Sequence, residues 1–157
     1  MQQPHSGQQT ARHPYRMLGV NLMMSLLIMY IAMFAMIWSW GEFIQNINFF
    51  YMALVMWAPM ATVMLLTMKP MYPDARLNAL LYAAFAVVFV LSFAGIRAQA
   101  LVGDKQFLRS MIPHHSGAVL MCSEAEIRDP EIKDLCGRII KSQTEEIDEM
   151  KAILKRL

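Results

Sequence analysis

The sequence predicts an all-α protein, with three transmembrane helices followed by an antiparallel helical hairpin. Two observations predict this fold class. Residues 17–96 carry only four charged side chains and contain three long apolar runs. Residues 97–157 carry ten Lys and Arg and ten Asp and Glu, set around apolar positions with helical spacing. The mean hydropathy of +0.36 and the net charge of +2 therefore average two unlike halves, and neither half has the basic surface of a nucleic-acid-binding protein.

The first sixteen residues are polar, rich in glutamine and contain two prolines. Such a segment cannot bury enough apolar surface to fold alone, so we expect residues 1–16 to form a disordered cytoplasmic tail. A three-span transmembrane region is predicted for residues 17–96, because the uncharged runs 17–40, 49–68 and 77–96 each contain at least twenty residues. A helix rises about 1.5 Å per residue, so about twenty residues cross a hydrocarbon core about 30 Å thick.

The basic residues predict the orientation of these spans. Arg12 and Arg16 precede the first span, and two basic residues lie between the second and third spans, whereas residues 41–48 contain none. The positive-inside rule places the basic segments in the cytoplasm. Three crossings then put residues 97–157 outside. We therefore expect a multi-pass protein of the bacterial inner membrane, with a cytoplasmic N-terminus and a periplasmic C-terminal domain.

Methionine recurs at every fourth position of the second span, at Met52, Met56, Met60, Met64 and Met68. One interpretation is a thioether path for a soft cation such as Cu(I). The other is adaptable apolar packing between helices, which is the usual role of methionine at helical spacing. The sequence favours packing for this reason, and a transporter is not favoured because the spans carry no intramembrane charge of the kind that marks transport paths.

The C-terminal part has start signals for two helices. Asp104 is the expected N-cap of a helix over residues 105–127, and Asp129 followed by Pro130 predicts the start of a second helix. The apolar residues of the second helix recur with helical spacing as far as the C-terminus. Because the connection is short, we expect the two helices to be antiparallel neighbours.

The two cysteines of the chain lie in this predicted hairpin. If the helices pair symmetrically about Asp129, Cys122 lies opposite Cys136, and His115 lies opposite Gln143. Facing cysteines outside the cytoplasm form disulfides, so we predict a Cys122–Cys136 bond. Two alternatives stay open: small buried thiols at a close helix contact, or metal ligands together with the histidines.

The hairpin also holds the densest cluster of potential metal ligands in the chain. The candidates are Met111, His114, His115 and Met121 on the first helix, and Gln143, Glu146 and Met150 across the hairpin. Imidazole and thioether groups together suit copper or silver better than magnesium or calcium. In the alternative interpretation, the histidines are core residues with a hydrogen-bond partner, and the acidic run at 145–149 is a solvated face.

The segment FLRSMIPHHSGAVLMCSEAEIRDPEIKDLCGRIIKSQTEEIDEMKAIL closely resembles the family called domain of unknown function 305. The elements that carry the resemblance are Phe107, the MIPHH stretch at 111–115, Gly117-Ala118, Met121, Asp129-Pro130, Ile139-Ile140, Gln143, Glu146-Ile147 and Met150. This ferritin-like helical family includes periplasmic copper-tolerance proteins of the CopM type. The resemblance covers about residues 104–154, here fused to an N-terminal three-helix membrane anchor, and implies a helical bundle in which Met and His bind copper or silver.

Two departures from the family pattern matter. Cys122 and Cys136 stand where the family is expected to have small residues, usually alanine. In addition, only one hairpin is present, and a hairpin of about fifty residues buries little core. We therefore expect a homodimer in which two hairpins form a four-helix bundle, assisted by anchoring in the lipid bilayer.

These observations predict a membrane-anchored, periplasm-facing protein that holds copper or silver for handling or tolerance. The alternative is a non-catalytic structural or interaction module in which the His and Met cluster is core packing. We do not expect an enzyme, because the sequence shows no nucleophile with a paired base, no Glu-x-x-His pair and no nucleotide-binding loop. We expect no nucleic-acid partner.

Overall fold

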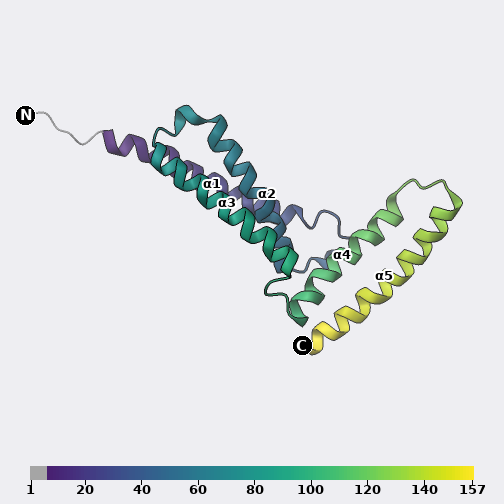
Figure 1. The fold of residues 1–157 in the computed structure, drawn as a ribbon. Coiled ribbons are helices and arrows are strands. Elements are labelled where there is room, and N and C mark those ends of the chain that lie inside the picture. The colour runs from purple at the N-terminus through teal and green to yellow at the C-terminus, as the bar shows by residue number, and fades with distance from the viewer. Residues whose placement is uncertain (1–6) are drawn as a thin grey trace, which may run out of the picture. The chain divides into compact units, whose positions relative to one another are not determined.

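A computed structural model describes residues 7–157 of the chain, with side chains from residue 14 onward. These residues form five α-helices and two short 3-10 helices and contain no strand (Figure 1), which confirms the all-α class. The elements are α1 (Gly7–Ala32), η1 (Trp40–Glu42), α2 (Ile47–Thr67), η2 (Lys69–Met71), α3 (Ala75–Ala98), α4 (Asp104–Glu124) and α5 (Pro130–Arg156).

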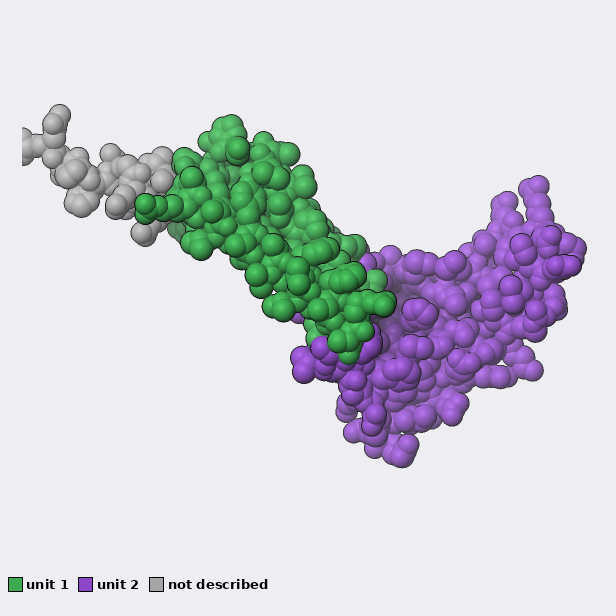
Figure 2. All heavy atoms as spheres, in the orientation of Figure 1, with its two compact units in different colours: residues 1–31, 51–98 green, residues 32–50, 99–157 purple. Residues whose placement is uncertain are grey.

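The chain divides into two compact units (Figure 2). The first unit consists of the chain up to Ile31 together with Tyr51–Ala98, and it therefore contains α1, most of α2 and all of α3. The second unit consists of Ala32–Phe50 and Gln99–Leu157. The loop between α1 and α2 thus packs with α4 and α5, although it lies far from them in the sequence.

Three helical segments of the described chain are long and apolar enough to cross a membrane. They are Pro14–Ala32, Ile47–Thr67 and Ala75–Ala98, with mean hydropathies of 1.4, 1.9 and 2.4. Their outward side chains are apolar, and Ile28 and Leu91 are more than 60% exposed. So large an apolar surface is unfavourable in water but suits a helix that faces lipid.

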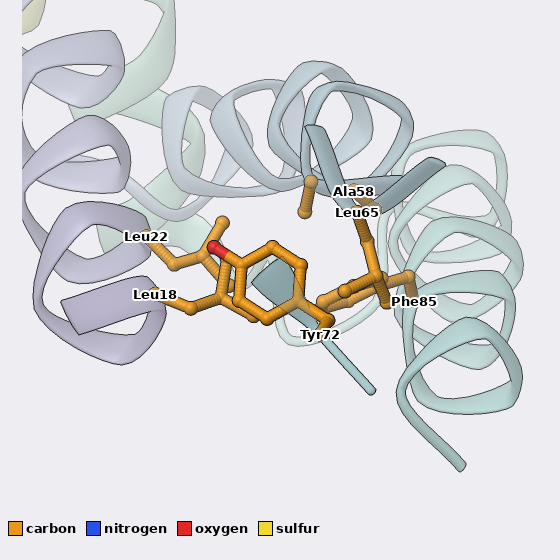
Figure 3. Close-up of a cluster of buried hydrophobic side chains, with 7 residues drawn as sticks. Leu18, Leu22, Ala58, Leu65, Tyr72 and Phe85 are labelled. Atoms are coloured by element: carbon orange, nitrogen blue, oxygen red, sulfur yellow. The ribbon is translucent and has the colours of Figure 1, made fainter. Parts of the chain in front are cut away.

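The helices of the first unit pack through a small apolar core (Figure 3). Leu18 and Leu22 of α1 meet Leu65 of α2 and Phe85 of α3. The indole N–H of Trp57 donates a 2.7 Å hydrogen bond to the backbone carbonyl of Leu22, which satisfies a polar group within an apolar bundle.

The methionine stripe of α2 does not face one environment. Met52 and Met56 are exposed, whereas Met60 and Met64 pack against the core of the first unit. Met68 lies just after α2. Together with Met64, Met17, Met24 and Met71 it lines a groove of about 420 Å³. Part of the stripe therefore serves the packing that the sequence favoured.

Helix α1 begins earlier than expected. It starts at Gly7, so residues 7–16 are helical and do not belong to the disordered tail predicted for residues 1–16. Residues 1–6 of that prediction lie outside the described residues. The end of this segment is held in place, because the hydroxyl of Tyr15 donates to Asn78 Oδ1 at 2.9 Å and accepts from the amide of Asp74 at 3.1 Å.

Helix α1 also ends earlier than the apolar run predicts, at Ala32 and not near residue 40. The chain there turns and forms η1, which Ser39 caps: its side chain accepts from the amide of Gly41, and its own amide donates to Glu42 Oε2 at 3.1 Å. This polar cap starts a separate short helix inside the uncharged run, and hydropathy alone does not detect it.

The second unit is built on α4 and α5. Asp129 caps α5 as predicted, because its carboxylate accepts from the amides of Glu131 and Ile132. The prediction for Asp104 was wrong: Gly103 occupies the N-cap position, and Asp104 is the first helical residue. Its carboxylate still lies at the positive end of the helix dipole. Helix α4 ends at Glu124, three residues before the predicted end.

Helices α4 and α5 share an apolar core and a covalent link. Leu108, Ile112 and Val119 of α4 pack against Ile147 and Met150 of α5. Next to the connection, Cys122 and Cys136 form the predicted disulfide, with their Cα atoms 5.2 Å apart.

The disulfide leads to a prediction about stability. Replacing both Cys122 and Cys136 with serine should lower the free energy of unfolding by about 3 kcal/mol, because the bond closes a loop of about fifteen residues in the unfolded chain. The measurement is denaturant unfolding of the detergent-solubilised full chain, with and without a reductant. The double variant should not respond to reductant. A parent protein whose stability is unchanged after its thiols have been released would contradict the prediction.

Candidate metal centre

Four of the candidate ligands, Met111, His114, His115 and Met121, lie on α4, which has three different faces. Successive residues of α4 turn by about 100°, so its side chains separate by direction. One face packs on α5 through Leu108, Ile112 and Val119. A second contacts the loop between α1 and α2, because the amide of Trp38 donates to Ser116 Oγ at 2.6 Å. The third face consists of Phe107, Met111, His114, Ala118 and Met121. Phe107, His114 and Met121 are exposed, whereas Met111 and Ala118 are half-buried and Met111 also packs against the core shared with α5.

His115 sits at the boundary between the α5 face and the third face, and it is 9% exposed. Its Nε2 lies 3.0 Å from Glu146 Oε2, and its Nδ1 lies 3.2 Å from the backbone carbonyl oxygen of Met111. Glu146 is oriented in turn, because Ser142 Oγ donates to its Oε1 at 2.9 Å. The partner of His115 is therefore Glu146, one helical turn beyond the Gln143 expected from symmetric pairing.

The surroundings of His115 favour its neutral form. Burial lowers the pKa of the imidazole; the Glu146 carboxylate opposes this effect and His114 adds to it, so that the pKa lies below its ordinary value. A neutral imidazole has one N–H and one lone pair. Since both ring nitrogens face oxygen acceptors, one of these two contacts lacks a hydrogen in either tautomer.

The other candidate ligands have varied positions. His114 is exposed, with its ring edge-on to that of His115 and the centroids 6.0 Å apart. Met121 is 58% exposed, whereas Met150 lies in the core, with Met111 packed against it. Gln143 is half-buried. Within residues 14–157 there is no group of three His, Cys, Asp or Glu side chains placed to hold one ion, so the structure brings together the His115–Glu146 pair but no complete set of such ligands.

Sequence reasoning missed the acidic residue that holds α4 in place. Glu42 comes from the loop and is only 6% exposed. Its Oε2 accepts from Ser116 Oγ at 2.5 Å, and its Oε1 accepts from Lys151 Nζ of α5 at 3.0 Å. A local signal was present, because Ser39 and Glu42 have the spacing of a capping box. The long-range partners of Glu42 had no signal in the sequence.

The partners of Glu42 outweigh the effect of burial on the pKa of its carboxyl group. Burial alone would raise the pKa of the Glu42 carboxyl, but hydrogen bonds from Ser116 and Lys151, the charge of Lys151 and the amide of Ser39 together lower it. The carboxylate is therefore ionised and paired. It joins the loop to α4 at Ser116, the residue directly after His115, and to α5 through Lys151.

Comparison with known proteins identifies the family of this chain. A family model described as "Domain of unknown function (DUF305)" matches residues 62–154. The chain belongs to the DUF305 family. A curated relative, "Uncharacterized protein L153" of Acanthamoeba polyphaga mimivirus, is 36% identical over 118 residues, which cover 74% of this chain and 76% of the relative. No solved structure matches.

The DUF305 match is longer than the resemblance recognised in the sequence. It begins at Thr62 within α2 and includes all of α3, whereas the resemblance began near residue 104. The DUF305 segment of this chain therefore contains one complete apolar helix, all of α4 and most of α5.

The Glu42 network predicts an effect on stability in this DUF305 protein. Glu42→Gln removes the charge that pairs with Lys151 and should lower the free energy of unfolding by about 1–3 kcal/mol at pH 7. The exposed Glu145 provides a matched control, because Glu145→Gln makes the same chemical change outside the network. The measurement is the unfolding midpoint of the full chain.

The difference in unfolding midpoint between the parent and Glu42→Gln should depend on pH. The pKa of Glu42 is lower in the folded state than in the unfolded state. The stability that its charge contributes is therefore fully present above the ordinary glutamate pKa of about 4.3, and it is lost as the pH falls through the folded-state pKa. The two unfolding midpoints should therefore converge in acid. A difference that stayed constant from pH 7 down to pH 3 would contradict this assignment.

Proposed function

We propose that this DUF305 protein is a membrane-anchored metal-binding protein that holds copper or silver at the junction of α4 and α5. One observation carries the proposal: His115 Nε2 lies 3.0 Å from Glu146 Oε2 while His115 Nδ1 faces the carbonyl oxygen of Met111 at 3.2 Å. Copper and silver handling or tolerance would follow from a site of this kind.

The two contacts of His115 match those of a metal-binding histidine. Such a histidine donates its second N–H to a carbonyl or carboxylate, and the carbonyl of Met111 can accept it. The lone pair on Nε2 then lies near a carboxylate oxygen, and a cation bound to both atoms from one side would relieve the repulsion between them. Ligand bonds of about 2.0–2.2 Å place two neighbouring ligands of one ion about 3 Å apart, in agreement with the distance to Glu146.

The donor types near the pair favour copper or silver over harder cations. Imidazole and thioether are ligands for copper and silver, and thioethers bind Cu(I) and Ag(I) in particular. Met111 lies one turn before His115 on α4, while Met121 and Met150 are further sources of thioether from α4 and α5. The exposed acidic residues Asp148 and Glu149 add negative charge that attracts cations.

The disulfide and the apolar helices support a location for this site. A disulfide forms in oxidising compartments, so the Cys122–Cys136 bond favours a periplasmic second unit. The three apolar helices would span the bacterial inner membrane, with the N-terminus in the cytoplasm. The resulting protein would present α4 and α5, as half of a ferritin-like bundle of the CopM type, at the outer surface of the bilayer.

A second function is supported by a different observation. Met111 and Met150 pack with Leu108 and Ile112, so part of the predicted ligand cluster serves the core. In that case the second unit would be a non-catalytic interaction module, and His115 and Glu146 would be a hydrogen-bonded pair. Both functions are non-enzymatic, and metal binding distinguishes them.

Titration calorimetry of the full chain with silver(I), and separately with copper(II), tests the proposal. The parent should bind about one ion per chain. Affinity should fall at least about 10–100-fold in His115→Ala and in Glu146→Gln. Glu145→Gln, which alters the adjacent exposed carboxylate, should bind like the parent. Parent protein that binds neither ion would refute metal binding, and equal affinity in His115→Ala would place the site elsewhere.

A further inference from the structure

The third face of α4 has the spacing of a helix–helix interface. Its residues Phe107, Met111, His114, Ala118 and Met121 are separated by four, three, four and three positions. We call this row the open seam. A mean spacing of 3.5 residues is that of helices packed at about 20° in four-helix bundles and coiled coils. Phe107 and Met121 are 51% and 58% exposed, although α4 is not among the described helices that are apolar enough to cross a membrane.

A second row with this spacing lies on α5. Leu135, Ile139, Ser142 and Glu146 are separated by four, three and four positions, and Leu135 is 46% exposed. The contact between His115 and Glu146 shows that this row borders the open seam. The two helices therefore present two adjacent rows to one side, as one half of a four-helix bundle does.

The composition of the two rows changes along their length. In the open seam, Phe107 and Met121 are at the ends and His114 is in the middle. On α5, Leu135 and Ile139 lie toward the connection, whereas Ser142 and Glu146 lie level with His115. The face therefore has apolar contact areas on both sides of a central group of imidazole and carboxylate ligands.

A second copy of this chain fits this face better than an unrelated partner. Two chains in one membrane with the same orientation are related by a two-fold axis along the membrane normal, and such an interface joins a surface to itself. Apolar ends then meet apolar ends, and the central ligands of one copy meet those of the other. The membrane also raises the effective concentration for this pairing.

The ligand set gives an independent reason for a second copy. Within the part of the chain whose side chains are described, His115 and Glu146 supply two ligands and no third His, Cys, Asp or Glu joins them. His114 is adjacent in sequence but points out along the open seam, so its natural partner is an ion held by another chain. A two-fold axis near His114 brings that imidazole to the His115–Glu146 pair of the second copy.

We propose that a second copy of this chain covers the open seam, and that each copper or silver ion binds His115 and Glu146 of one copy and His114 of the other. The shared ion rests on the proposed function, whereas the paired seam rests on the exposed rows alone. The dimer then has two equivalent sites, each incomplete without the other chain.

Cysteine cross-linking of the full chain in lipid nanodiscs tests the paired seam. The native cysteines are joined in a disulfide, so one introduced cysteine is the reactive thiol. Ala118→Cys lies in the open seam, one helical turn from the proposed two-fold axis near His114, and should give a disulfide-linked dimer under mild oxidation. Glu145→Cys, which is exposed outside the two rows, should stay monomeric. Equal cross-linking by the two variants, or none by Ala118→Cys, would overturn the paired seam.

A complementation experiment tests the shared ion, with silver(I) as the probe. Chains carrying His114→Ala and His115→Ala are co-expressed with different tags, and the mixed dimer is isolated by two affinity steps. In the mixed dimer one site keeps all three ligands, so about one silver ion should bind per dimer with parental affinity, against about two in the parent. Each variant alone should bind at least about 10-fold more weakly.

The outcomes separate this inference from the proposed function. Parent protein that binds silver as a monomer, or a mixed dimer with no parental site, overturns the shared ion and leaves metal binding by one chain intact. Cross-linking of Ala118→Cys in a parent that binds no silver overturns the proposed function and the shared ion, while the paired seam stands.

Discussion

The second unit depends on one buried carboxylate. Glu42 enters from the loop between α1 and α2 and accepts hydrogen bonds from Ser116 of α4 and Lys151 of α5. Burial of this charge is offset only because both partners are in place, so the loop and the two helices must adopt one arrangement together. The loop connects the apolar helices α1 and α2. The Glu42 carboxylate therefore links α4 and α5 to the segment between α1 and α2.

This constraint has a consequence for the candidate site. Ser116 fixes the rotation of α4 about its own axis, and the preceding residue, His115, then faces Glu146 at the edge of α5. The same rotation leaves His114 exposed. Adjacent histidines on one helix point about 100° apart, so one serves the pair within the chain and the other can serve a second chain. The proposed copper or silver site and the paired seam thus follow from one orientation of one helix.

Local chemistry was predictable from the sequence, and long-range geometry was not. The Asp129 cap and the Cys122–Cys136 disulfide follow from residues close to the connection, where an error in register has little room to grow. Farther from the connection the symmetric pairing failed by one turn, so Gln143 was assigned the place that Glu146 occupies. The role of Glu42 required knowledge of partners 74 and 109 residues away.

The central claim is that His115 and Glu146 bind one metal ion, and pulsed electron paramagnetic resonance of the copper(II)-loaded full chain tests it most directly. The account predicts modulation from the remote nitrogen of a coordinated imidazole, reduced in His115→Ala and retained in Glu145→Gln. A copper(II) spectrum that shows no imidazole nitrogen, or one that is the same in the parent and in His115→Ala, would contradict it.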